Sequence, residues 1–294
     1  MPTRISYDGM SRLTAAGYLE NGKLNNHFST SYKYDIMGNI LTLRREGLLD
    51  SGDYGTIDDL TYSYEGNQVV KIDDAADESP NYSGAIHFRD AANEETVYTY
   101  DANGNIHRDA LTGFYIYYNL LNLPTVIYTE GDMGLYYTYL SDGTKIEVCG
   151  YDDNEPTRYA GSLVYNDGTF ESASFGGGRI VGTNNGANSE VHYFLTDHLG
   201  STRVVAKVTP TGREDLDRND YYPFGKEWAQ PDMPTSDNRY IFFGKEKRHL
   251  RFQQIDYTDF GARFYDAEGG HFLQQDPLLE KYFRIGQYNF AREI

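Results

Sequence analysis

The chain has 294 residues, 44 of them acidic and 26 basic, giving a formal net charge of -18. The basic residues form no cluster, which excludes a nucleic-acid surface that must neutralise phosphates and argues against an anionic membrane. Cys149 is the only cysteine, so no disulfide forms within the chain, and the seven histidines show no metal-ligand spacing. We therefore expect no metal and no cofactor, and we ascribe the acidic excess to solubility.

A short tyrosine-containing unit repeats along the chain. The pattern Tyr-Asp-x-x-Gly-Asn-Ile occurs at 34–40 and again at 100–106, and blurred copies begin at Tyr7, Tyr64 and Tyr118. There are 28 tyrosines, far above ordinary usage, so aromatic side chains carry much of the packing. We expect their rings to pack and pair across strands rather than to stack on a ligand.

Each unit is predicted to be a β-hairpin. Tyrosines alternate with other residues before the Tyr-Asp pair, as in Tyr32-Lys33-Tyr34, and a period of two indicates a strand with one face to pack. Asp, Asn and Gly supply a tight turn, and Ile40 or Ile106 starts the return strand. Because an isolated hairpin is barely stable, the copies must pair into an extended sheet.

The units are spaced irregularly, which favours one continuous all-β array with turns of varying length over a strict solenoid. Residues 71–95 are acidic and low in apolar content, and 171–190 contain clusters of Gly and Asn, so both are predicted to be long loops or insertions. Gly176-Gly177-Gly178 lacks the Lys and the following helix of a phosphate-binding loop and is predicted to be a flexible turn.

The last third of the chain contains four further aromatic blocks. They lie at 192–205, 221–225, 239–246 and 256–266, and the last is followed by Gln275-Asp276-Pro277. In this order they resemble the Rhs repeat-associated core domain, and the upstream units resemble the YD repeats that precede it. The segment that begins at Asp276-Pro277-Leu278 is similar to Bacteroidetes-type members.

The resemblance implies a YD-repeat array over residues 1–190, continuous with a core-like segment over 191–294. It implies a curved or spiralling sheet, part of a shell that encloses a toxin, with the core acting as plug and self-cleaving protease. The partners it implies are toxin cargo and other shell segments. Relatives are exported or surface-associated, whereas this sequence shows neither a signal peptide nor an 18-residue apolar run.

Self-cleavage in relatives depends on an Arg and two Asp, and the matching positions are Arg263, Asp266 and Asp276. Two carboxylates can divide acid and base roles when their surroundings separate their pKa values. Two positions depart from the family pattern, since Ala267 replaces a Pro and His271 replaces a second Arg. By resemblance these three residues are the candidate catalytic site.

A structural interpretation of the same residues follows from strand geometry. A turn at residues 267–270 pairs Asp266 with His271 and places Asp276 diagonally opposite Arg263. A long Arg can bridge to that aspartate, whereas Asp266 sits at the turn. The alternative roles are thus a cross-strand ion pair for Arg263 and Asp276, and turn capping for Asp266.

Three functions remain open at this point. The first is a structural shell or scaffold segment of an Rhs-type toxin system, unable to process itself because the family's scissile segment and toxin are expected to be missing after Tyr288-Asn289. The second is a carbohydrate-binding module with solvent-facing tyrosines. The third is an aspartic-type peptidase acting through Asp266 and Asp276.

Overall fold

The computed structural model describes residues 3–77, 96–130, 132–150, 156–228, 234–250, 255–281 and 285–290. In these ranges the regular elements are β-strands and three short 3-10 helices, and every strand pair is antiparallel. The expected all-β class is confirmed. Each strand of the two large sheets pairs with its neighbours in sequence, as an array of consecutive hairpins requires.

The first sheet contains six strands in sequence order. Its strands are β1 (Thr3–Tyr7), β2 (Leu13–Glu20), β3 (Lys23–Tyr34), β4 (Ile40–Leu48), β5 (Tyr54–Glu65) and β6 (Gln68–Asp74). The tyrosine runs lie at the ends of β3 and β5, where the sequence pattern predicted strands.

The second sheet contains thirteen strands, also in sequence order. They are β7 (Tyr98–Tyr100), β8 (Ile106–Asp109), β9 (Phe114–Tyr118), β10 (Pro124–Thr129), β11 (Asp132–Tyr139), β12 (Lys145–Gly150), β13 (Thr157–Ala160), β14 (Leu163–Asn166), β15 (Thr169–Phe175), β16 (Gly178–Thr183), β17 (Asn188–Thr196), β18 (Thr202–Thr209) and β19 (Gly212–Arg218).

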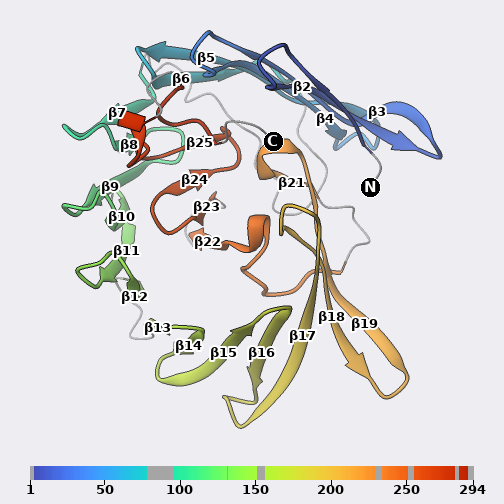
Figure 1. Ribbon diagram of the computed structural model, residues 1–294, viewed down its shortest axis with the longest axis vertical. Coiled ribbons are helices and arrows are strands. Elements are labelled where there is room, and N and C mark those ends of the chain that lie inside the picture. The colour runs from blue at the N-terminus through green and yellow to red at the C-terminus, as the bar shows by residue number, and fades with distance from the viewer. Residues whose placement is uncertain are drawn as a thin grey trace.

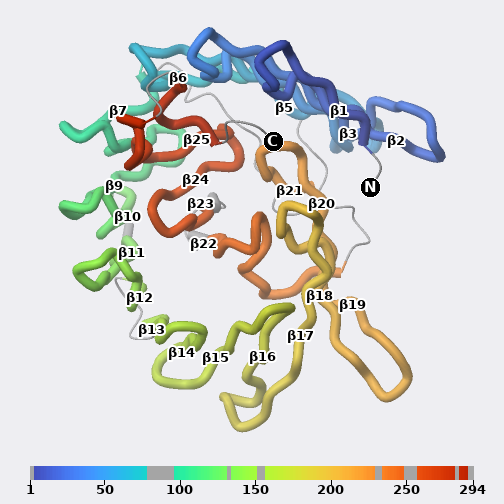
Figure 2. Tube along the Cα trace, in the orientation of Figure 1, coloured from blue at the N-terminus to red at the C-terminus, as the bar shows by residue number. Residues whose placement is uncertain are grey.

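The two sheets form one curved wall. They meet where the backbone N–H of Val97 donates to the carbonyl of Val70 at 2.7 Å. Figures 1 and 2 show the wall bending from the sheet of β1 to β6 at the top, down past β9 to β12, and round to β19. It is an open, spiralling sheet rather than a closed barrel, because β1 and β19 are end strands of their sheets.

The described residues between 220 and 290 are here called the inner segment, and they lie inside the curve of the wall, as the orange and red parts of the trace show (Figures 1 and 2). Their elements are short: β20 (Asp220–Tyr221), η1 (Pro223–Gly225), β21 (Glu227–Trp228), η2 (Phe242–Gly244), β22 (Glu246–Leu250), β23 (Ile255–Asp259), β24 (Phe264–Asp266), β25 (His271–Phe272) and η3 (Leu279–Lys281). The chain therefore winds a wall first and then fills the space within it.

The Tyr-Asp turn has the same geometry in both full copies. In the first copy, Oδ1 of Asp35 accepts hydrogen bonds from the backbone N–H groups of Met37 and Asn39, at 2.8 and 2.9 Å. Gly38 has a φ of +84°, a conformation that favours glycine. Asp101 and Gly104 repeat both features. The motif therefore serves to form the tight turn of a hairpin.

The second tyrosine of each unit joins neighbouring repeats. The hydroxyl of Tyr34 donates to the carbonyl of Leu13 at 2.7 Å, and that of Tyr64 donates to the carbonyl of Ile40 at 2.8 Å. Tyr100 and Tyr118 make the corresponding bonds to Val69 and Ile106. Each ring is packed against the core, and its hydroxyl satisfies a carbonyl of the preceding unit, so the predicted packing role is confirmed.

The main hydrophobic core lies between the wall and the inner segment. It combines wall residues such as Leu43, Leu60 and Ile116 with Tyr257 and Phe264 of the inner segment, all at most 1% exposed. Burial of apolar area on this scale is the dominant force that holds the inner segment in place.

The loop prediction for 171–190 was wrong, because these residues form most of β15, β16 and the start of β17. The Gly and Asn clusters occupy the two connecting turns, at 176–177 and 184–187. The strands escaped detection because they bury little apolar surface. Of the other predicted loop, 71–95, the first residues belong to β6, while 78–95 lie outside the described residues.

Candidate functional site

The hairpin β24–β25 of the inner segment carries the residues singled out in the sequence. Asp266 pairs with His271, the register expected for a turn at residues 267–270. Gly270 has a φ of +71°, and its backbone N–H donates to the carbonyl of Asp266 at 2.9 Å. The position of the turn is therefore fixed by the backbone conformation that glycine permits.

Arg263 and Asp276 form the ion pair that strand geometry predicted. Nη2 of Arg263 lies 3.0 Å from Oδ2 of Asp276, and the guanidinium stacks 3.7 Å from the ring centroid of Phe272. Burial lowers the pKa of Arg263, and the charge of Asp276 opposes that effect. Oδ1 of Asp276 also accepts from the backbone N–H of Leu278 at 2.7 Å. This carboxylate thus holds a guanidinium and starts a turn.

The carbonyl of Gln287 lies beside the same pair and accepts two hydrogen bonds. The backbone N–H of Asp276 donates to it at 3.0 Å, and Nη1 of Arg263 donates at 3.4 Å. Two converging donors polarise a carbonyl and stabilise negative charge on its oxygen. The Arg263–Asp276 pair therefore contacts a peptide group of the chain's own C-terminal part.

Asp266 has different surroundings. It is 6% exposed, and its Oδ1 accepts from the backbone N–H of Glu268 at 2.8 Å, which is the predicted turn cap. Its charge, after the larger effect of burial, raises the pKa of Asp109 on β8 to about 6. Burial also lowers the pKa of His271, an effect that Asp266 opposes. Asp266 is thus paired in the hairpin with His271 and its charge acts on Asp109, whereas Asp276 pairs with Arg263.

Asp109 was not identified from the sequence. Its Oδ2 accepts from the hydroxyl of Tyr257 at 3.0 Å, and its Oδ1 accepts from the backbone N–H of Leu111 at 2.9 Å. Tyr257 lies 148 residues further along the chain. A contact between residues so far apart leaves no local sequence signal.

A second buried charge cluster joins β4 and β5 to the inner segment. Nη1 of Arg45 lies 3.0 Å and Nζ of Lys226 lies 3.2 Å from Oδ2 of Asp58. Lys226 also lies 2.7 Å from Glu268, and Nη2 of Arg45 donates to the Glu268 carbonyl, again at 2.7 Å. Arg45, Asp58 and Lys226 are at most 2% exposed. Charges so deeply buried are tolerated only when paired, so this cluster fixes the docked position of the 267–270 turn.

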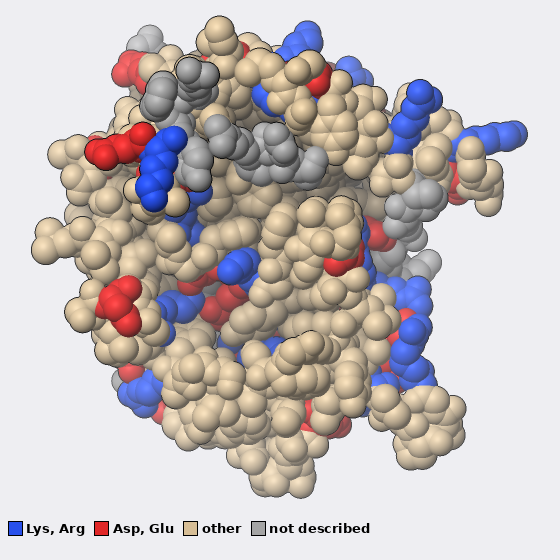
Figure 3. Space-filling view, in the orientation of Figure 1, with Lys and Arg blue, Asp and Glu red and all other residues tan. Residues whose placement is uncertain are grey.

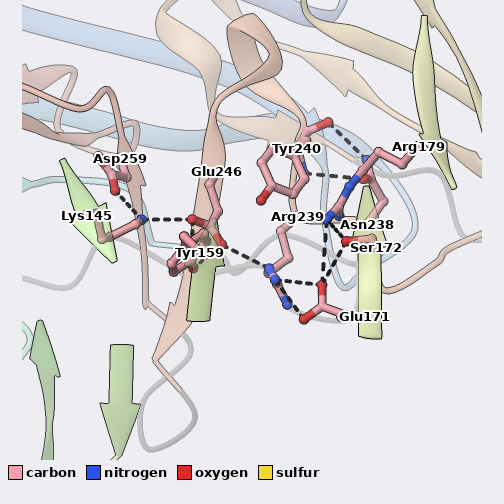
Figure 4. Close-up of polar contacts among 10 residues, drawn as sticks. All are labelled: Lys145, Tyr159, Glu171, Ser172, Arg179, Asn238, Arg239, Tyr240, Glu246 and Asp259. Atoms are coloured by element: carbon pink, nitrogen blue, oxygen red, sulfur yellow. Dashed lines mark hydrogen bonds and ion pairs between the residues drawn. The ribbon is translucent and has the colours of Figure 1, made fainter. Parts of the chain in front are cut away.

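A third polar network joins strands of the wall to the inner segment (Figure 4). Lys145 of β12 contacts Asp259 and lies 2.8 Å from Oε2 of Glu246. The hydroxyl of Tyr159 on β13 donates to Oε1 of Glu246 at 2.9 Å. Glu246 is 6% exposed, so a nearly buried carboxylate joins two wall strands to β22.

The network continues onto β15 and β16. Nη2 of Arg239 lies 2.8 Å from Oε1 of Glu171, and its Nε lies 3.1 Å from Oε1 of Glu246. Arg179 contacts Ser172, and its guanidinium lies 4.1 Å from the ring centroid of Tyr240. In the orientation of Figure 1, the surface has a central hollow in which acidic and basic side chains lie together (Figure 3).

These arrangements are suited to holding parts of the chain together. The carboxylates of Asp58, Asp266, Glu246 and Asp276 each accept a hydrogen bond from, or pair with, a group of the protein. No cluster of His, Cys, Asp and Glu suited to a metal ion occurs among the described residues. Within those residues there is also no helix long and apolar enough to cross a membrane. The catalytic assignment of Arg263, Asp266 and Asp276 stays a prediction.

Comparison with known proteins relates the fold to solved Tc toxin structures. No family model and no curated protein matches the chain. Among solved structures, the chain is similar to the crystal structure of TcdB2-TccC3-Cdc42, with a TM-score of 0.61 and 17% identity over 99% of this chain. It is also similar to the Photorhabdus luminescens Tc holotoxin pore, with a TM-score of 0.62 and 16% identity over 99% of this chain.

The matched region is a small part of each neighbour. The chain covers 16% of the matched chain in both structures. At this identity the likeness shows the fold alone, and it confirms the expected Rhs-type shell fold. It agrees with the geometry, in which a spiralling wall surrounds an inner segment.

Proposed function

We propose that this chain is a structural wall segment of an Rhs-type toxin system, with a scaffold role rather than a catalytic one. The observation that carries this proposal is the path of the chain, which forms a curved wall and then runs inside it. The hydroxyl of Tyr288, near the end of the described chain, contributes to this docking by donating to the carbonyl of Gly104 at 2.5 Å. Cargo attached beyond this point starts on the concave side.

Protease accessibility of two tags tests the proposal. Identical unstructured peptide tags are fused to the N-terminus, which precedes the exposed strand β1, and to the C-terminus, which follows the docked inner segment. We expect the C-terminal tag to be cleaved several-fold more slowly at low protease concentration. Equal cleavage of the two tags in the intact protein contradicts a containing role for the concave side.

The peptidase alternative rests on one specific observation, the two donors on the Gln287 carbonyl. The sequence predicted a peptidase acting through both Asp266 and Asp276, whereas at this carbonyl the carboxylate that acts is that of Asp276. Under this alternative, water attacks the carbonyl carbon, Asp276 accepts a proton of the water, and the bond to Tyr288 breaks as Asp276 returns that proton to the Tyr288 nitrogen. Mass spectrometry of the purified protein distinguishes the two functions. The scaffold predicts an intact chain, whereas the peptidase predicts loss of residues 288–294 that an Asp276→Asn variant prevents.

The carbohydrate-binding alternative requires tyrosine rings that face solvent. The repeat tyrosines Tyr32, Tyr62 and Tyr98 are at most 6% exposed and belong to the core. On the outer side, the rings of Tyr117 and Tyr128 stack on each other at 5.9 Å. Because the repeats supply core rather than surface, we favour the scaffold.

A further inference from the structure

One part of the wall differs from the rest in what it buries. Strands β13 to β17, residues 157–196, are here called the wall panel, and all of its residues are described. Val164 is its only buried hydrophobic residue. By contrast, β4 and β5 alone bury Leu43, Ile57 and Leu60 completely. The panel therefore gains little of the apolar burial that holds the other strands against the inner segment.

The polarity of the two faces is inverted around Arg179 and Ile180 of β16. Arg179 of β16 points toward the inner segment, where it contacts Tyr240. Ile180 follows it in the strand and lies on the opposite face, opposite Val191 in the sheet. Tyr193 and Leu195 share that outer face, and these four apolar residues are 37% to 46% exposed. At this position a charged side chain faces inward and apolar side chains face solvent, the reverse of an ordinary wall strand.

Polar contacts join the panel to the inner segment. They are the ion pair of Glu171 with Arg239, the cation–π contact of Arg179 with Tyr240, and the hydrogen bond of Tyr159 to Glu246. We call these six residues the ionic latch. Glu171 and Arg239 are 23% and 27% exposed, so dissolved salt reaches this ion pair and screens it.

The backbone connections at the two ends of the panel are unequal. Among the residues that the structure describes, β12 and β13 pair through two residue pairs, Glu147 with Arg158 and Val148 with Thr157. β17 and β18 pair through five, from His192–Lys207 to Thr196–Thr202. The β12–β13 pairing, here called the seam, is shorter than the β17–β18 pairing. We therefore expect the seam to open at a lower free-energy cost.

We propose that the wall panel is a flap that opens at the β12–β13 seam while it remains paired to β18, and that the ionic latch holds it shut. Opening breaks the two β12–β13 residue pairs and replaces the contacts of the ionic latch with contacts to water. It exposes little buried apolar surface. High ionic strength favours the open state because it screens the ion pair of the latch. The inference concerns this chain's own wall and does not depend on which cargo the shell encloses.

Hydrogen–deuterium exchange of the wild-type protein at rising potassium chloride concentration tests the flap. Between about 0.05 M and 1 M salt the screening length shrinks to about 3 Å. We expect backbone exchange in β13 and β14 to accelerate about tenfold, while β4 and β5 stay protected. Exchange in the panel that does not change with salt, or a uniform increase over the whole wall, overturns the proposal.

A matched pair of variants distinguishes the effect of the latch carboxylate from the effect of removing any negative charge from the panel. Glu171→Gln removes the carboxylate that binds Arg239, and we expect it to speed exchange of β13 and β14 at low salt and to weaken their salt dependence. Glu190→Gln removes a carboxylate of the same panel that interacts with His192 and Lys207 within the sheet. Equal effects of the two variants contradict the latch. The wild-type salt series remains decisive if a variant fails to fold.

Discussion

Replacing Asp58 with asparagine should destabilise the protein by about 3–5 kcal/mol. Asp58 accepts a hydrogen bond from Arg45 and pairs with Lys226, and all three residues are at most 2% exposed. Burial alone would raise the pKa of Asp58, but Lys226 and Arg45 lower it below its ordinary value, so the carboxylate is charged at neutral pH. The variant leaves two buried cations with Glu268 as the remaining carboxylate of the cluster.

The expected size of the effect follows from burial rather than from the number of contacts. A surface ion pair contributes less than about 1 kcal/mol, whereas an uncompensated buried charge carries a desolvation cost of several kcal/mol. An unfolding entropy of about 2.1 cal/mol/K per residue, applied to 294 residues, converts this loss to a fall in Tm of about 5–8 °C.

Thermal and urea unfolding measure the loss, with Asp59→Asn as the matched control. Asp59 is the next residue in β5, on the opposite face, and pairs in register with Arg44. Its replacement should change stability by no more than about 0.5 kcal/mol. If Asp58→Asn lies within about 1 kcal/mol of the wild type, or matches the control, then the buried charge cluster does not hold the inner segment. The stability that Asp58 supplies should also disappear as the pH falls through its lowered pKa.

Three further predictions concern single contacts. Tyr64→Phe removes the hydroxyl that donates to the carbonyl of Ile40 and should cost about 1 kcal/mol in urea unfolding. Gly104→Ala places a side chain at a φ of +78° against the inner segment and should cost at least about 1–2 kcal/mol, more than Gly66→Ala, which has open space around it; thermal unfolding of both variants compares them. Because burial raises the pKa of Asp109 to about 6, its stabilising contribution is complete below the ordinary value and is lost as pH rises through 6. The stability of the wild type relative to Asp109→Asn, followed by urea unfolding, should therefore fall by up to about 3 kcal/mol between pH 4 and 7, and a flat difference contradicts the assignment.

The hairpins could be predicted from the sequence because the interactions that form them are local. Asp35 caps its own turn, Gly38 permits the backbone conformation, and Tyr34 reaches only to the neighbouring unit. The register of the last hairpin is equally local, since one turn fixes both the pairing of Asp266 with His271 and the diagonal approach of Asp276 to Arg263. Side-chain alternation and turn chemistry suffice for such features.

The strands at 171–190 were missed for a related reason. Prediction of a strand relies on an apolar face that is buried, and in the wall panel the inner face carries Glu171 and Arg179 instead. The glycines and asparagines there mark short turns rather than a long insertion. The unusual polarity that hid these strands is also what suggests a movable flap.

Taken alone, the sequence determined the all-β class, the hairpin unit, the packing role of the tyrosines and the ion pair of Arg263 with Asp276. The tertiary structure alone decided which wall residues the inner segment packs against, that the charge of Asp266 acts on Asp109, and that Asp58 binds both Arg45 and Lys226. The physical reason is distance along the chain. Local features depend on neighbours within a few residues, whereas a buried charge finds its partner only after a wall of nineteen strands has curved round it.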